Sequence, residues 1–304
     1  MISVLKQLLI LYFFIFMGWA FGKRKPELSD KSNLLSFLLI NLFLPCKLFG
    51  NFSKNFTVSY LKENYVTFFI SLSLLLVLVV LAKFLAPLLT KDSYEQKVYR
   101  YSIPIANYAY MGYVLVEALF GPQGLTNLIL FCIPFIVYTN YFGFALLTAK
   151  GDMWKRLLNP VTGAILVGMV FGLLRLPVPE VATTVLSMAS GCVGPVSMLL
   201  AGLALSAFSL KDMLFDKMTY VFLSLRLLGI PLFVFGLCKV LGLLFTLPAA
   251  VYPSAVFMAC MPNGLNTVAF PKLVGEDCRL GARLALLSHL FACITLPIWI
   301  SILS

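Results

Sequence analysis

The chain has 304 residues, of which 61% are hydrophobic and only 12% are charged, and its mean hydropathy is +0.97. Soluble domains carry roughly a quarter of charged residues, so this composition excludes an ordinary globular protein and indicates a polytopic membrane protein. The net charge of +11 raises the question of nucleic acid, but no loop is long enough to form a domain with a basic face. We therefore expect the lipid bilayer, and no nucleic acid, as a partner.

Continuous apolar runs of about 20 residues, the length of a membrane-spanning helix, recur along the whole chain. They predict an all-α fold with ten transmembrane helices, at residues 4–22, 33–50, 64–90, 98–119, 124–149, 160–176, 184–208, 214–245, 251–271 and 280–303. Lys and Arg gather in the loops after the odd-numbered spans, and the even-numbered loops carry only Lys54, Lys62 and Arg175. This distribution predicts that the odd loops face the cytoplasm and that both termini lie outside.

Ten spans with both ends on one side divide into two sets of five, and the second set then enters the membrane inverted, as in many secondary transporters. We expect a first five-helix repeat at residues 1–149, a short cytoplasmic linker at 150–159 and a second, inverted repeat at 160–304. Small residues at helical spacing, Gly18 with Gly22 and Ala164 with Gly168 and Gly172, predict close helix packing, which also permits a homodimer.

Spans four and nine carry helix breakers at corresponding places. Pro104 and Asn107 in span four match Pro262 and Asn266 in span nine. Proline removes a backbone donor and clashes with the preceding turn, so both spans should break near their middle. A broken helix directs the partial positive charge of a half-helix N-terminus at the break, and asparagine supplies donors and acceptors. The pattern predicts a site for a small solute, favouring an anion, between two crossing helices.

Three further residues are candidates for substrate binding. Asn263 stands directly beside Pro262, and Asn41 lies four residues before Pro45 in span two. Arg226 lies two to three turns inside span eight, where it either neutralises a substrate carboxylate or holds helix ends together; the sequence leaves both roles open.

Candidates for ion coupling are few. Eleven of the twelve acidic residues fall in loops or at span edges, and the twelfth, Glu117, lies one turn before Gly121, either at the membrane interface or within span four. His289, the only histidine, lies in the middle of span ten as either a satisfied core residue or a proton carrier. Uncoupled anion transport, sodium coupling through neutral oxygens and proton coupling therefore all stay open. The seven cysteines have no paired spacing, so we expect no metal site and no cofactor.

Several motifs in order along the chain resemble the auxin efflux carrier family in its short bacterial form. They are NLFLP in span two, the stretch from Asn107 to Gly112 that leads to EALFGPQG, LLNPVTGAILVGMVFGLL, GPVSMLLAGLALS, Arg226 ahead of Pro231, and MPNGLNTVAF. The resemblance implies the ten-helix inverted-repeat fold shared with bile acid sodium symporters, with crossover helices at spans four and nine. It also implies transport of organic anions across a bacterial inner membrane. Plant relatives of the PIN-FORMED type carry a long cytoplasmic loop where this chain has the short linker.

Three classes of function remain. The first is a secondary carrier of small organic anions, such as carboxylates, by alternating access. The second is an intramembrane enzyme, which we do not expect, because the sequence contains no HExxH and no Ser/His arrangement within a recognisable motif. The third is a receptor with a transporter-like fold, which no sequence feature excludes.

Overall fold

The computed structural model describes residues 2–30, 32–148, 159–209 and 216–303. The expected linker at 150–159, apart from Asn159, lies outside these residues. The described part is helical, and its only pairing of extended segments is one isolated antiparallel bridge. Its helices, with π-helical turns written η, are α1 (Ile2–Arg24), α2 (Glu27–Asp30), α3 (Asn33–Leu38), η1 (Leu39–Phe43), α4 (Leu44–Asn55), α5 (Val58–Leu89), α6 (Ser93–Ser102), η2 (Tyr108–Gly112), α7 (Tyr113–Tyr138), η3 (Thr139–Gly143), α8 (Phe144–Thr148), α10 (Pro160–Leu174), α11 (Glu180–Gly191), α12 (Val193–Ser206), α14 (Lys217–Ser224), η4 (Leu225–Gly229), α15 (Ile230–Leu244), α16 (Val251–Cys260), α17 (Asn266–Val274) and α18 (Arg279–Leu303).

Seven helical stretches of the described chain are long and apolar enough to cross a membrane. They are Val4–Arg24, Asn33–Asn55, Val58–Leu89, Tyr108–Thr148, Glu180–Ser206, Lys217–Leu244 and Arg279–Leu303. Pro160–Leu174 and Val251–Cys260 are shorter apolar helices. These helices confirm the prediction of an all-helical integral membrane protein.

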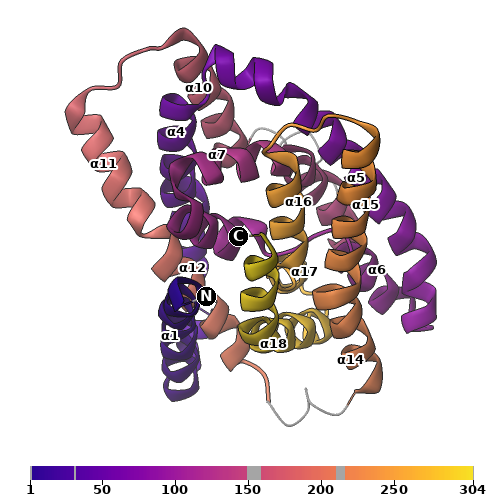
Figure 1. Ribbon diagram of the computed structural model, residues 1–304. Coiled ribbons are helices and arrows are strands. Elements are labelled where there is room, and N and C mark those ends of the chain that lie inside the picture. Colours follow the sequence, from indigo (N-terminus) through magenta and orange to yellow (C-terminus); the bar gives the residue numbers. More distant parts are fainter. Residues whose placement is uncertain (1, 31, 149–158, 210–215, 304) are drawn as a thin grey trace.

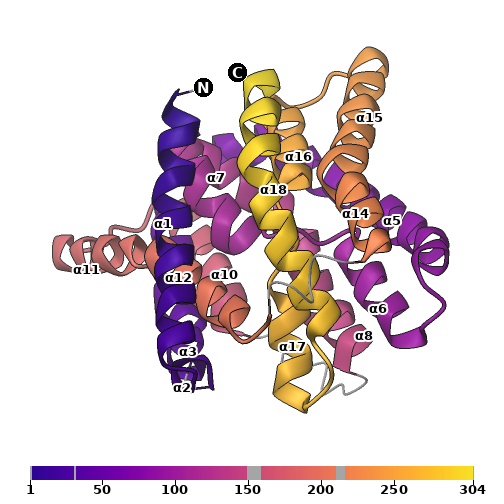
Figure 2. The same cartoon turned by 90° about the horizontal axis from the view of Figure 1, so that it is seen from below.

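The helices form two groups, which Figure 1 shows side by side. In the first, here called the panel, α1 packs along α12, and α4 packs against α10 and α11. The second, here called the core group, contains α5 to α8 and α14 to α18, with α16, α17 and α18 at the centre of the molecule. Figure 2 shows the start of α1 and the end of α18 at the same end of the molecule.

Glycines bring the panel helices together. A Cβ atom on Gly18 of α1 would lie 2.2 Å from the Leu199 carbonyl oxygen, and one on Gly202 of α12 would lie 2.0 Å from that of Ile15. Gly172 of α10 approaches the backbone of α4 in the same way. The predicted small-residue faces are thus confirmed as packing faces, and they are used within the chain.

A sharp turn divides α7. Gly121 adopts φ 70° and ψ −173°, a conformation that side chains with a Cβ rarely allow, and Pro122 follows it. The predicted end of span four and start of span five therefore lie on either side of one residue, and no open loop separates them.

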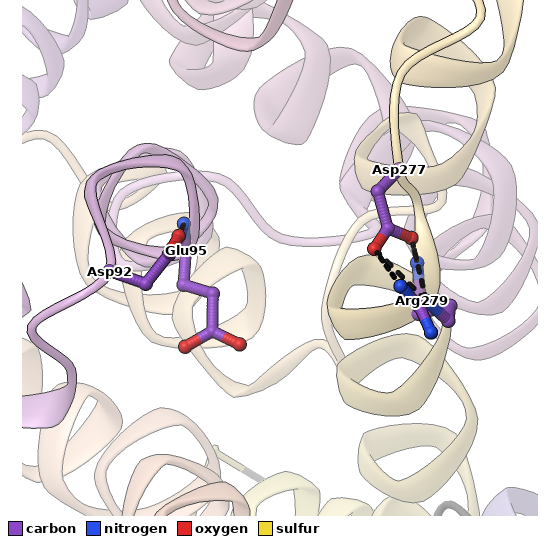
Figure 3. Close-up of polar contacts among 4 residues, drawn as sticks. All are labelled: Asp92, Glu95, Asp277 and Arg279. Atoms are coloured by element: carbon purple, nitrogen blue, oxygen red, sulfur yellow. Dashed lines mark hydrogen bonds and ion pairs between the residues drawn. The ribbon is translucent and has the colours of Figure 1, made fainter.

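Carboxylates begin two of the core-group helices (Figure 3). Asp92 accepts hydrogen bonds from the backbone N–H groups of Tyr94 and Glu95 at the start of α6. Asp277 accepts from the backbone N–H and the guanidinium of Arg279 at the start of α18. Such caps satisfy donors that have no partner within the helix, so both helices have defined starting points.

Candidate functional site

Two helices are interrupted in the interior of the core group, and their extended segments pair with each other. The first break separates α6 from η2, at residues 103–107, and the second separates α16 from α17, at 261–265. The backbone N–H of Asn107 donates to the Pro262 carbonyl oxygen at 2.8 Å, and Ala106 and Asn263 form the isolated antiparallel bridge. We call these two segments together the crossing.

The local sequence explains why both helices stop here. Pro104 and Pro262, both buried, lack the N–H group that would continue each helix. Gly264 lies beside the first segment, where a Cβ atom would meet the Ala106 carbonyl oxygen at 3.4 Å, an ordinary contact distance. Backbone groups freed at membrane depth must find partners inside the protein, and the pairing across the crossing supplies some of them.

Arg226 satisfies the C-terminal ends of both interrupted helices. Its Nη1 donates to the carbonyl oxygen of Ile103 at 3.2 Å, and its Nη2 donates to that of Met261 at 3.1 Å. The side chain is 0% exposed, and among the described residues no carboxylate lies within ion-pair distance of it. Of the two roles that the sequence left open, these contacts correspond to holding helix ends together.

The N-terminal ends at the crossing have no comparable partner. The helix that continues from η2 into α7 begins after Asn107, and α17 begins at Asn266. Neither has an acidic residue in its first turn, and neither N-cap residue makes a side-chain capping bond. The partial positive charges of these two ends therefore lack a compensating carboxylate.

Asn263 contributes an unpaired acceptor at the centre of the crossing. Its backbone N–H donates to Ser288 Oγ at 2.9 Å, and its side-chain Nδ2 donates to Thr267 Oγ1 at 3.3 Å. Its Oδ1 atom is buried and has no hydrogen-bond partner in the described structure. A buried polar atom without a partner is costly, and one in a native protein calls for an explanation such as a ligand or water.

Asn107 and His289 lie against each other, although they are 182 residues apart in the chain. Asn107 Nδ2 is 3.0 Å from His289 Nε2, and the other ring nitrogen, Nδ1, is 2.6 Å from the Ala285 carbonyl oxygen. The hydroxyl of Tyr12 on α1 donates to the backbone carbonyl of His289. The panel thus touches α18 at this residue.

The remaining predicted residues occupy different places. Asn266 is half-buried as the first residue of α17 and adjoins the crossing. Asn41 is exposed in η1, where its Nδ2 donates to the Phe37 carbonyl oxygen of its own helix. Glu117 forms an ion pair with Lys47 of α4. The structure therefore groups Asn107, Asn263, Asn266, Arg226 and His289 with the two prolines, and it does not bring Asn41 or Glu117 to them.

Two polar residues of the crossing were absent from the sequence-based candidates. Thr267 bonds Asn263 and the carbonyl oxygen of Gly264, and Ser288 bonds the Asn263 backbone. Each stands directly beside a residue that was singled out, Asn266 and His289 respectively. The sequence signal that could have found Thr267 and Ser288 is the pairing of two adjacent polar residues within an apolar span.

Comparisons with known proteins identify a family for this chain. A family model described as membrane transport protein matches residues 3–151 and 144–300, which is essentially the whole chain. An uncharacterized transporter from Methanothermobacter thermautotrophicus is 28% identical over 201 residues, which cover 64% of this chain and 63% of that relative. The matched region thus spans somewhat less than two thirds of the relative.

Proposed function

The chain belongs to the membrane transport protein family, the auxin efflux carrier-like family that its motifs resemble, and we infer that it is a transporter and not an enzyme. From this premise we propose that it is a secondary carrier of small organic anions, with the substrate carboxylate held at the crossing. Asn107, Asn263 and Asn266 would contact the substrate, and the proline breaks at Pro104 and Pro262 would hold them in place.

The proposal rests on a difference in charge compensation between the C-terminal and the N-terminal helix ends at the crossing. Arg226 neutralises the two C-terminal ends through Ile103 and Met261, whereas the two N-terminal ends have no carboxylate. The fixed charges and dipoles of the crossing therefore sum to a positive potential. A buried positive potential favours an anion over a cation or a neutral solute.

We further propose ten membrane crossings in two inverted five-helix repeats. Dividing Tyr108–Thr148 at Gly121 adds one crossing to the seven long stretches, and the two shorter apolar helices add two more. The breaks before η2 and before α17 then fall in the fourth and ninth crossings. This arrangement supports a transport cycle in which the core group moves against the panel. The location in a bacterial inner membrane and the outward termini belong to the same proposal.

Coupling to sodium finds less support than coupling to protons. In other carriers, backbone carbonyl oxygens of unwound helices bind sodium. In this chain the carbonyl oxygens at the unwound ends, those of Ile103 and Met261, accept hydrogen bonds from Arg226. His289, in contrast, is a titratable group that contacts the proposed substrate residue Asn107. We therefore propose proton coupling as the alternative to uncoupled anion transport.

Uptake by proteoliposomes tests the proposal. Labelled malate, succinate, benzoate and indole-3-acetate are offered with and without a sodium gradient, a proton gradient and a potassium diffusion potential, and empty liposomes correct for passive entry. We expect saturable uptake of at least one carboxylate, without a requirement for sodium. No carrier-dependent flux or exchange of any of the four, in protein that is monodisperse, would sink the assignment to small carboxylates.

Alanine variants of the crossing asparagines test where the substrate binds. Asn107→Ala and Asn263→Ala should each abolish uptake and leave the purified protein monodisperse. Asn64→Ala is the matched control, because Asn64 is also a buried asparagine but bonds only the Tyr60 carbonyl oxygen of its own helix. Normal uptake by both crossing variants would show that the substrate binds elsewhere.

A further inference from the structure

The hydrogen bonds of His289 define its protonation state. A backbone carbonyl oxygen can only accept, so Nδ1, which lies 2.6 Å from the Ala285 oxygen, carries a hydrogen and donates it. In the neutral ring Nε2 is then an acceptor, and the amide group of Asn107 donates to it from Nδ2. Both ring nitrogens are thus engaged, in a residue that is 2% exposed.

Protonation would reverse one of these bonds. A proton added to Nε2 turns that atom into a donor, which faces the Asn107 N–H group and repels it. The contact is restored when the Asn107 amide rotates by half a turn, so that Oδ1 accepts from Nε2–H. The amide N–H group then takes the place that Oδ1 held, and a donor replaces an acceptor on the side of Asn107 turned away from the histidine.

We propose that His289 takes up one proton together with each substrate anion, and that the Asn107 amide transmits the event to the substrate by this rotation. The proposal rests on the proposed function, which places the anion beside Asn107. The proton comes from hydronium in the aqueous phase: one O–H bond of hydronium breaks and leaves water, and the Nε2 lone pair forms the new N–H bond. A carboxylate prefers the donor that protonation presents, so proton and anion each favour the binding of the other.

The described helices packed around His289 offer no free carboxylate to pair with its protonated ring, so the substrate anion would supply the counter-charge. The ionisable side chains that α1, η4, α16 and α18 bring to this region are Tyr12, Arg226, Cys260 and Cys293, and none is a carboxylate. η2 contributes tyrosines, α17 contributes Lys272, and α12 has no ionisable side chain.

The carboxylates near the other elements packed on α18 are already engaged. Asp216, which caps α14, pairs with Arg283, and Glu95 of α6 accepts a hydrogen bond from Thr90. Among the described residues an imidazolium at His289 would therefore lack a paired carboxylate until an anion arrives.

The sequence offers a direct test, because His289 is the only histidine. When the protein is purified with a tag that contains no histidine, labelling with ¹⁵N-histidine gives one pair of imidazole signals in solid-state NMR of the reconstituted protein. We expect the Nδ1–H tautomer without ligand and a doubly protonated ring at the same pH in saturating malate, succinate, benzoate or indole-3-acetate, whichever the carrier transports. An Nε2–H tautomer without ligand, or a ring that stays neutral with the transported anion bound, would overturn the proposal.

Transport of the same anion gives an independent readout. With the membrane potential clamped at zero, one proton per anion should produce about tenfold accumulation for each unit of inward acid gradient, because a tenfold ratio corresponds to 1.4 kcal/mol. His289→Gln keeps an amide that can accept from Asn107 but takes up no proton. We expect this variant to retain exchange of labelled for unlabelled anion and to lose accumulation driven by the gradient.

Tyr12→Phe is the matched control, since it removes the hydroxyl that bonds the His289 backbone and leaves the imidazole contacts intact. It should accumulate the anion as the wild type does. Gradient-driven accumulation by His289→Gln equal to that of the wild type would refute the proton role while leaving the carrier assignment standing. Absence of any flux in the wild type would instead refute the proposed function, and the coupling with it.

Discussion

Lys47 of α4 forms an ion pair with Glu117 of α7, and this pair joins the panel to the core group. One turn further along α4, Asn51 donates to the Pro122 carbonyl oxygen at 3.0 Å and accepts a hydrogen bond from Thr126. Polar contacts of α4 thus lie on both sides of the Gly121 turn. Any movement of the core group against the panel must break these contacts or carry them along.

The two halves of this ion pair should respond differently to mutation. The Lys47 side chain is 4% exposed, whereas that of Glu117 is 37% exposed. Glu117→Gln leaves a buried, unpaired ammonium and should cost about 3 kcal/mol, whereas Lys47→Met leaves a carboxylate that water can reach and should cost less. The midpoints of unfolding in detergent for both single variants and the double variant measure this. The double variant should be more stable than Glu117→Gln, and the reverse order would contradict the burial argument.

Arg226 should be needed for stability as well as for transport. Arg226→Met leaves the buried carbonyl groups of Ile103 and Met261 without donors, which should cost at least about 2 kcal/mol. Arg226→Lys keeps the charge but not the forked geometry, so it should recover only part of the loss. Thermal unfolding in detergent reports the difference. The control is Arg175→Met, at an exposed position; equal midpoints for Arg226→Met and this control would exclude the bridging role.

Gly202 should tolerate no side chain. A Cβ atom there would lie 2.0 Å from the Ile15 carbonyl oxygen, so Gly202→Ala must separate α1 from α12, at a cost of about 1–3 kcal/mol. Gly236→Ala is the matched control within α15, where nothing lies within 4 Å of the added atom. Alanine should leave stability unchanged there or raise it by up to about 1 kcal/mol. Thermal unfolding midpoints that rank the two variants the other way would disprove the close approach.

The Asp216–Arg283 ion pair should make stability depend on pH. Partial burial raises the pKa of Asp216, but hydrogen bonds from Thr219, the Met218 backbone and Arg283 outweigh it, and the net pKa is lowered. A pKa lower in the folded state means that the ionised form stabilises the fold. This contribution is complete above about pH 4, the ordinary value for Asp, and is lost as the pH falls through the lowered value.

Asp216→Asn isolates that charge, because asparagine also caps helices well. The wild type should exceed the variant by about 0.5–1 kcal/mol at pH 7, and the difference should shrink towards zero at pH 3. Unfolding midpoints at the two pH values measure it. A difference that stays constant between them would assign the effect to something other than the carboxylate charge.

Local chemistry made much of the fold predictable. The loss of a backbone donor at Pro104 and at Pro262 is a property of each residue alone, so both helix breaks were predicted at the places where the structure has them. Glycine spacing likewise predicted close packing at Gly18 and Gly172. The sequence placed the boundary between spans four and five at residues 120–123, but it did not reveal that Gly121 alone makes the turn, because a Gly-Pro pair fits an open loop as well as a sharp turn.

The sequence by itself determined a helical membrane protein with two interrupted helices, because hydropathy, proline and glycine act over a few neighbouring residues. Only the tertiary structure decided which side chains meet at those interruptions. It joined Arg226 to two helix ends, set Asn107 against His289 and left Asn41 outside. Such contacts depend on how whole helices rotate and cross, and a pairing between residues 182 positions apart leaves no local pattern in the chain.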